Sequence, residues 1–313
     1  MKNNQKVIGI FGGSSFLARY TIEKLCKEGY RLKIGTRKPW LVNNLKTLGS
    51  PGQLELISTN IFNSHDIKNI LKNCNYCINF CGQLFEEKIS FNQLHVDWPD
   101  ILSKISSENN IEKLIHVSAL NAQENNPSKY MQSKMKGEEK IKNNIENYFI
   151  LRPSLIFGNG DDKFFGTFGT MSEISPIIPL PGGGKTVFNP VHVSDCAEAI
   201  VKILELSNSK KRTYEIAGLK NYTFKNLIEI FLREIKKKKL LVSFPFNLMK
   251  VQSYFLQYMP QPFKITPDQI ILLQYNSTLS GKFPTLKDLD IKPKDLESVF
   301  KFWKRWRVGG EFG

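Results

Sequence analysis

The chain has 313 residues, of which 41% are hydrophobic and 23% charged, a composition typical of a globular protein with a full hydrophobic core. Its formal net charge of +15 indicates an acidic partner, such as nucleic acid or an anionic membrane surface. Lysine is much commoner than arginine, as in chains from AT-rich genomes, and no RNA- or DNA-binding motif accompanies the charge. Nucleic acid is therefore excluded as the expected partner.

Short apolar runs alternate with helical patterns through the first half of the chain. Strands are expected at 6–11, 31–36, 54–58, 76–80, 113–117 and 148–152, with helices at 16–28, 41–48, 64–73, 91–109 and 128–144. This alternation predicts an α/β fold, a Rossmann-type doubly wound parallel sheet with a small C-terminal lobe. We expect the nucleotide-binding domain to span 1–155 and to be completed by about 186–217. The segments 156–185 and 218–313 then form a lobe for substrate or partner.

A glycine-rich turn follows the first expected strand. Gly12 permits a tight turn, and Gly13 leaves backbone N–H groups open to phosphates at the N-terminus of the next helix. Ser15 and Ala18 stand where the dinucleotide-binding pattern has further glycines, and the Ser15 hydroxyl can donate to a phosphate oxygen. The candidate pyrophosphate-binding residues are Gly12, Gly13, Ser14, Ser15, Phe16 and Leu17. The alternative is an ordinary strand-to-helix turn that binds nothing.

The ends of the other predicted strands carry further candidate residues. Ligands of doubly wound sheets bind beyond the carboxyl ends of the strands, where this chain repeatedly places polar or small residues. The additional candidates for cofactor binding at this edge are Arg37, Asn60, Cys81, Gly82 and Pro153.

Arg37 indicates which nucleotide is bound. In NAD-binding sites an acidic residue at the end of the second strand accepts a hydrogen bond from the ribose 2′-hydroxyl and repels a 2′-phosphate. Thr36, Arg37 and Lys38 stand at that place here, and a guanidinium can pair with a 2′-phosphate. The sequence therefore predicts NADPH as the cofactor, with NAD as the alternative and a solvated basic turn as the interpretation without a ligand.

Ser118 ends the fifth expected strand, and Tyr130 and Lys134 lie one helical turn apart on the helix that follows. Together with 12–18, 79–82, 152–154 and 191–195, these residues resemble the extended and atypical branches of the short-chain dehydrogenase/reductase superfamily. The resemblance implies that Tyr130 is the general acid/base and that Ser118 orients the substrate oxygen. It also implies that Lys134 holds the nicotinamide ribose and lowers the pKa of Tyr130. An isolated Tyr-x-x-x-Lys pair is otherwise common on helix surfaces.

A closer resemblance extends over 116–122, 127–138, 151–158 and 182–195. These segments are similar to the atypical subfamily that contains the NADPH-binding accessory subunit of respiratory complex I and its bacterial relatives. The resemblance implies a structural NADPH and partners in complex I or in quinone biosynthesis, with turnover in doubt. The enzymatic alternative is an NADP(H)-dependent oxidoreductase or epimerase/dehydratase that acts on a prenylated, steroid-like or sugar substrate. A third alternative is a nucleotide-sensing regulator.

The five cysteines do not predict a metal site. Cys74, Cys77 and Cys81 are closely spaced, but there is no second cluster, and side chains alternate between the two faces of a strand. Buried, reduced thiols are expected, and the N-terminus shows no signal peptide. We therefore expect no metal, and a bacterial-type cytoplasmic location with the option of a peripheral position at the inner membrane.

The C-terminal third contains two basic stretches beside apolar residues. Lysines 236–239 precede the apolar segment 240–259, and the chain closes with the basic, aromatic stretch 300–307. That segment is too polar for a membrane span, but a basic cluster beside aromatic residues is typical of an interfacial helix on anionic lipid. The alternative is a lobe helix that packs its apolar face on the core.

Overall fold

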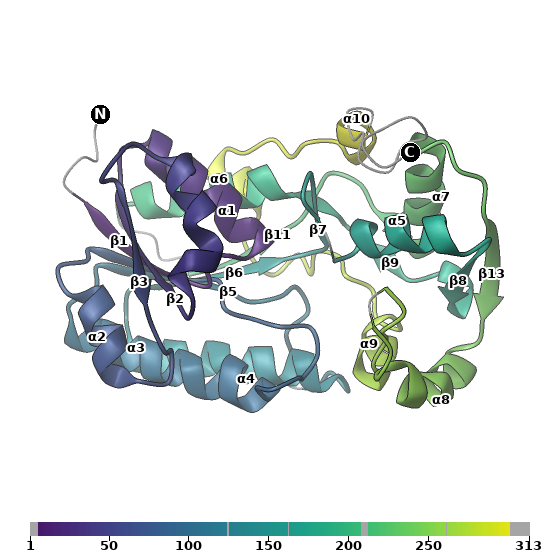
Figure 1. Cartoon of the computed structure of the whole chain (residues 1–313), viewed down its shortest axis with the longest axis horizontal. Helices are drawn as coiled ribbons and strands as arrows, with labels where there is room; N and C mark the ends of the chain where they lie inside the picture. Colours follow the sequence, from purple (N-terminus) through teal and green to yellow (C-terminus); the bar gives the residue numbers. More distant parts are fainter. Residues whose placement is uncertain (1–5, 124, 162, 208–211, 261, 301–313) are drawn as a thin grey trace. The chain divides into compact units, whose positions relative to one another are not determined.

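The computed structural model describes residues 6–123, 125–161, 163–207, 212–260 and 262–300, and most of their helices and strands are labelled in Figure 1. These residues form two compact units. The first comprises the described residues of Met1–Pro153, Val193–Ile216 and Gly281–Ile291. The second comprises those of Ser154–His192, Ala217–Ser280 and Lys292–Gly313. The stretch Gly281–Ile291, expected in the lobe, thus belongs to the first unit, where the Glu215 amide donates to the Pro284 carbonyl at 2.9 Å.

The first unit is built on a parallel sheet of seven strands in the order β11-β6-β5-β4-β1-β2-β3. The strands are β1 (Val7–Phe11), β2 (Arg31–Thr36), β3 (Leu54–Ser58), β4 (Tyr76–Asn79), β5 (Lys113–Val117), β6 (Tyr148–Pro153) and β11 (Thr213–Ile216). The predicted Rossmann-type sheet is confirmed. The chain order reverses between β1 and β4, and such a switch point leaves a crevice beyond the carboxyl ends of these two strands.

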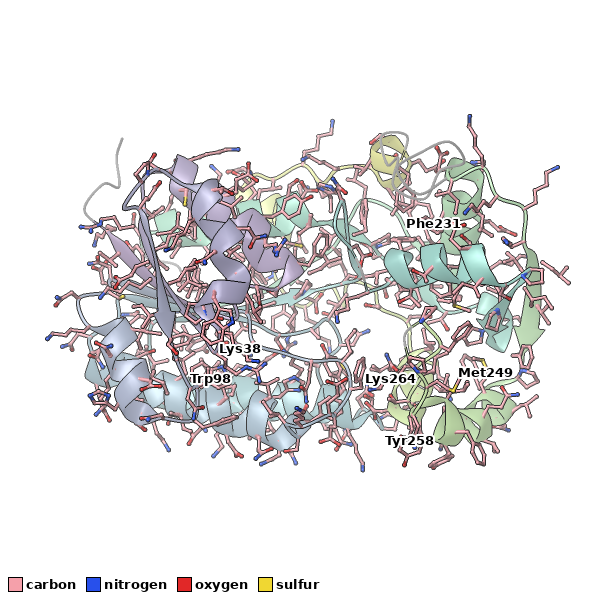
Figure 2. All side chains as sticks on the ribbon, viewed as in Figure 1. Lys38, Trp98, Phe231, Met249, Tyr258 and Lys264 are labelled. Carbon is pink, nitrogen blue, oxygen red and sulfur yellow. The ribbon has the colours of Figure 1, made fainter. Side chains whose placement is uncertain are left out.

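Helices cover both faces of this sheet (Figure 1). On one face lie α1 (Phe16–Lys27) and α6 (Val193–Glu205), and on the other lie α2 (Ser64–Leu71), α3 (Trp98–Glu108) and α4 (Lys129–Asn144). Trp98, labelled in Figure 2, is fully buried and meets the Phe11 ring edge to face at 5.0 Å. This contact anchors α3 on the strand that leads into the glycine turn.

Two expected helices differ from simple α-helices. The first, near 41–48, is the 3₁₀ stretch η1 (Pro39–Leu48). The second, expected as one helix over 91–109, begins with the π-helical turn η2 (Gln93–Asp97) before α3. A Cβ at Gly137 of α4 would lie 1.9 Å from the carbonyl oxygen of His95. The π turn therefore packs its backbone directly against α4 at a position that only glycine allows.

The second unit has three short strand pairs and five helices among its described residues. The pairs are β7 (Ile156–Phe157) with β10 (Val191–His192), β9 (Val187–Phe188) with β12 (Tyr222–Thr223), and β8 (Ile177–Pro181) with β13 (Leu240–Phe244). The helices are α5 (Phe165–Ile174), α7 (Phe224–Glu234), α8 (Phe246–Leu256), α9 (Pro267–Leu272) and α10 (Leu296–Phe300). The 3₁₀ turns η3 (Gly182–Gly184) and η4 (Leu286–Leu289) lie in the second and first unit respectively.

Aromatic side chains dominate the core of this second unit. Phe165 and Phe231, the latter labelled in Figure 2, are buried, and the Phe165 ring meets that of Phe300 edge to face at 4.8 Å. Phe300 is therefore a core residue, although it opens the stretch 300–307 that the sequence associates with lipid. The remainder of that stretch lies outside the described residues.

Candidate active site

The glycine turn joins β1 to α1 and packs against the end of β4. Gly12 has a φ of +79°, and a Cβ there would lie 2.8 Å from the amide nitrogen of Cys81 and 2.9 Å from the carbonyl carbon of Phe80. Such a turn is restricted to glycine both by its left-handed backbone and by this close approach. Because the turn leads directly into α1, backbone N–H groups at the helix N-terminus face the carboxyl edge of the sheet.

The residues after Gly12 take different roles in the turn. Gly13 is buried, Ser14 is exposed, and the Ser15 hydroxyl oxygen caps α1 by accepting from the Ala18 amide at 3.3 Å. Phe16 opens the helix, while the Leu17 side chain is buried in the core. Leu17 can therefore face a cofactor only through its backbone, and Ser15 has a structural role that the sequence does not show.

Asn79, at the end of β4, holds the next part of the edge. Its Oδ1 accepts from the Cys81 amide and from the Trp98 indole, each at 3.0 Å, and its Nδ2 lies 3.0 Å from Nδ1 of His116. Because the amide Nδ2 can only donate, the bond to His116 fixes Nδ1 of that ring as an acceptor. This network fixes the backbone of Cys81 and Gly82 beside Gly12. Burial raises the pKa of the Cys81 thiol to about 12, so the residue is a neutral packing group.

Lys134 reaches this edge from the first turns of α4. Its Nζ donates to the Val117 carbonyl at 3.2 Å, and a Cβ at Gly82 would lie 2.9 Å from the same Nζ. Burial lowers the pKa of Lys134 to about 8. Ser118, at the end of β5, is buried as well, and its hydroxyl has no hydrogen-bond partner within the described part of the chain.

Tyr130 is enclosed by two rings. The Phe91 centroid lies 5.8 Å from that of Tyr130 and the His95 centroid 5.5 Å, both in edge-to-face arrangements. Burial raises the pKa of the Tyr130 hydroxyl, whereas the sequence predicts that Lys134 lowers it. The aromatic enclosure and the direction of Lys134 toward Val117 explain the difference. A phenol in this setting keeps its proton at neutral pH and can act as a hydrogen-bond donor.

His95, in the π turn, connects the β4 loop to α4. Its Nε2 accepts from the Gln83 amide at 3.1 Å, and its Nδ1 lies 2.9 Å from Oγ of Ser133. That hydroxyl donates to the Tyr130 carbonyl at 2.7 Å, so the pattern assigns the proton of the ring to Nδ1. Burial, with the charge of Lys134 nearby, lowers the pKa of His95 to about 2 and keeps the ring neutral. Sequence reasoning missed this residue, and its only signal is a histidine within an apolar helical segment.

Three further predicted residues complete the edge. Arg37 lies exposed after β2. Pro153 ends β6, and its carbonyl accepts from the Leu120 amide at 2.9 Å. Asn60 is used locally, because its Oδ1 accepts from the Phe62 amide at 3.1 Å in the turn before α2.

Residues 8–217 match the NAD dependent epimerase/dehydratase family. The chain belongs to this family. The predicted resemblance to extended and atypical short-chain dehydrogenases is thereby confirmed, and an NAD(P) nucleotide is the cofactor typical of the family.

Relatives in this family match nearly the whole chain. The mitochondrial NADH dehydrogenase [ubiquinone] 1 alpha subcomplex subunit 9 of Arabidopsis thaliana is 29% identical over 317 residues, which cover 97% of this chain and 79% of the relative. The subunit of the same name from Dictyostelium discoideum is 28% identical over 311 residues, covering 98% of this chain and 86% of the relative. Both relatives are subunits of mitochondrial NADH dehydrogenase [ubiquinone], and identities of 28–29% make them distant relatives of this chain.

Solved structures of similar fold support the same architecture. The triphenylmethane reductase of Citrobacter sp., solved in complex with NADP(H), superposes with a TM-score of 0.74 at 16% identity, covering 94% of this chain and 99% of that one. At this identity the likeness shows the fold.

The residues at the carboxyl edge fit the nucleotide of the family. Gly82 leaves room beside the buried ammonium of Lys134, where any larger residue would collide. The buried Ser118 hydroxyl lacks a partner among the described residues, so a ligand oxygen would satisfy it. Gly12 lets the turn into α1 lie directly against the backbone of Phe80 and Cys81. A nicotinamide nucleotide held at this edge would supply hydride, and Ser118, Tyr130 and Lys134 are the side chains of this chain that would donate hydrogen bonds to it or to a substrate.

Within the described part of the chain, no group of three or more His, Cys, Asp or Glu side chains is arranged to hold a metal ion. Cys74 and Cys77 are buried, and burial raises the pKa of the Cys74 thiol to about 11. No helix among the described residues is long and apolar enough to cross a membrane.

Proposed function

We propose that this chain is an NADP(H)-binding accessory or assembly protein of respiratory complex I or of quinone metabolism, peripheral to the inner membrane of a bacterial-type cell. The supporting observation is the extent of its similarity to the subunit 9 relatives, which covers 97–98% of this chain and so includes the second unit. The cofactor is held as a structural element by the glycine turn, Lys134 and the edge of the sheet.

Association with complex I is tested in the native host. The chain is tagged on the chromosome, membranes are solubilised in mild detergent, and blue native gels are stained for NADH dehydrogenase activity and blotted for the tag. The proposal predicts that the tag migrates with the active band. Migration of all tagged chain at its own mass, together with normal complex I assembly in a deletion strain, would contradict a role in complex I.

The preference for NADPH is supported by the basic end of β2. Arg37 and Lys38 are both exposed there, Lys38 is labelled in Figure 2, and no carboxylate follows Thr36. A guanidinium can form charge-assisted hydrogen bonds with a 2′-phosphate that NADH lacks.

We expect Arg37→Asp to raise the Kd for NADPH about tenfold or more, because one charge-assisted hydrogen bond to the 2′-phosphate is lost. The Kd for NADH should stay within about twofold of the wild-type value. Calorimetric titration with both nucleotides measures the two constants. Arg31→Asp is the matched control, because Arg31 is an exposed arginine at the opposite end of the same strand. Equal effects of the two substitutions would show that Arg37 acts only through net charge.

An enzymatic role is the second candidate, supported by the burial of Ser118, Tyr130 and Lys134 together at one edge. In this case the chain is an NADP(H)-dependent oxidoreductase or epimerase/dehydratase with a prenylated, steroid-like or sugar substrate. Burial raises the pKa of Tyr130, so the hydroxyl is protonated at neutral pH and can donate a hydrogen bond to a substrate oxygen held by Ser118.

The substitution Tyr130→Phe separates the two candidates. Phenylalanine keeps the ring that packs against Phe91 and His95 and removes only the hydroxyl. The accessory role predicts unchanged NADPH affinity and full complementation of a deletion strain. Loss of complementation, by a variant that still binds NADPH with wild-type affinity, would support catalysis instead.

A further inference from the structure

Helix α8 carries apolar side chains on two opposite faces. On one face Met249 and Ser253 are buried, one helical turn apart. Leu248, Val251 and Phe255 follow one another at spacings of three and four residues, so they share another face, and all three are exposed. Tyr258, just beyond the helix, continues this spacing and is 84% exposed, while Phe255 is 77% exposed. Met249 and Tyr258 are both labelled in Figure 2.

This exposed face is unusual for a helix that already has a buried one. Single exposed apolar residues are common on proteins, but a row of four large ones on one helix face indicates a surface that binds an apolar partner, either a protein or a membrane. We define the α8 face as Leu248, Val251, Tyr254, Phe255 and Tyr258, all of which are exposed.

The charge around the α8 face indicates which kind of partner binds it. The segment 245–267, which includes α8, contains two lysines and no aspartate or glutamate, whereas lysines 236–239 lie at the other end of β13 (Figure 1). Lys250 lies exposed on α8 itself, and Lys237 pairs with Glu173 of α5. A partner that meets this segment therefore needs negative charge beside an apolar interior. The surface of an anionic bilayer has both properties.

The side chains of the α8 face also match the depth profile of a membrane surface. Tyrosines are enriched at the level of the lipid headgroups, while phenylalanine and leucine enter the acyl boundary. The α8 helix has 11 residues, about half the length that spans a bilayer, so it can lie only along the surface.

We propose that α8 lies in the headgroup region of an anionic bilayer, with Phe255 and its neighbours on the α8 face inserted and Lys250 against the lipid phosphates. This inference is independent of cofactor binding and of catalysis. It places the lipid contact on α8, within the segment 240–259 that the sequence offers as an interfacial helix.

Flotation of the full chain with vesicles tests the proposal. Vesicles of phosphatidylcholine alone are compared with vesicles in which about a third of the lipid is phosphatidylglycerol, at low and at physiological salt. We expect binding to the anionic vesicles only. The double variant Val251→Ser/Phe255→Ser and the single variant Lys250→Glu should each reduce the bound fraction at least fivefold. Nucleotide binding by the same variants provides a readout that membrane binding does not affect, and shows that they are folded.

Two matched controls change equivalent residues elsewhere. Leu219→Ser removes another exposed apolar side chain of the second unit, and Lys46→Glu reverses an exposed lysine of η1. Both should float as the wild type does, and so should a chain that ends at Phe300. Absence of wild-type binding to anionic vesicles would overturn the proposal and favour a protein partner for the α8 face. Loss of binding only in the chain that ends at Phe300 would overturn it in favour of the terminal residues.

Discussion

Replacing Glu138 with alanine should lower the free energy of unfolding by about 3–5 kcal/mol, the cost of breaking a buried ion pair from one side. Glu138, on α4, is fully buried and accepts from Arg152 of β6 at both oxygens, with distances of 2.9 Å and 2.6 Å. Without the carboxylate the guanidinium stays buried between Met135 and the Phe283 ring. Urea unfolding followed by circular dichroism measures the loss.

Two further variants make this result specific. Glu139→Ala changes the next residue, which is exposed, and should cost no more than about 0.5 kcal/mol. Glu138→Leu combined with Arg152→Met removes both buried charges and should recover part of the lost stability, since the remaining partner of Glu138, Lys142, is partly exposed to solvent. A loss below about 1 kcal/mol for Glu138→Ala would show that the pair does not hold α4 on the sheet.

Gly12→Ala should raise the Kd for NADPH at least tenfold and also lower the stability of the first unit. The added Cβ meets the backbone of Phe80 and Cys81, so the turn must move away from the end of β4 and take the N-terminus of α1 with it. The left-handed φ of +79° adds about 1–2 kcal/mol for any residue with a Cβ. Calorimetric titration and urea unfolding of the same preparation separate the two effects.

Gly52 offers a matched control for this substitution. Its φ is +78°, nearly that of Gly12, but an added Cβ would have no atom within 4 Å among the described residues. Gly52→Ala should therefore carry the backbone strain alone and leave nucleotide affinity unchanged. If both substitutions left the affinity for NADPH intact, the glycine turn would not be the pyrophosphate site.

The sequence was sufficient to predict the parallel sheet and the edge at which the candidate residues lie. Each strand is a short apolar run, and each candidate residue follows such a run, so Gly12, Arg37, Gly82 and Ser118 had to meet at one edge once the strands were parallel. The position of Tyr130 and Lys134 on one helix follows from their spacing alone.

The parts that the sequence did not predict depend on contacts between distant segments. The π turn at His95 packs its carbonyl oxygen against Gly137, 42 positions later, where a Cβ would leave no room for it. The pKa of Tyr130 depends on rings that only the folded chain brings around it. For α8, the apolar pattern fitted both a core helix and an interfacial helix, and only the exposed fractions distinguish its two faces.

The nucleotide content of the purified full chain shows whether the chain holds NADPH as a structural cofactor. The protein is purified at neutral pH without added nucleotide and denatured gently, and the released nucleotide is identified by mass spectrometry and quantified by absorbance of the reduced nicotinamide. If NADPH is a structural cofactor, the preparation releases it in an amount near one per chain. A purified chain that releases no nucleotide, and that binds neither NADPH nor NADH when titrated with them, would contradict this role.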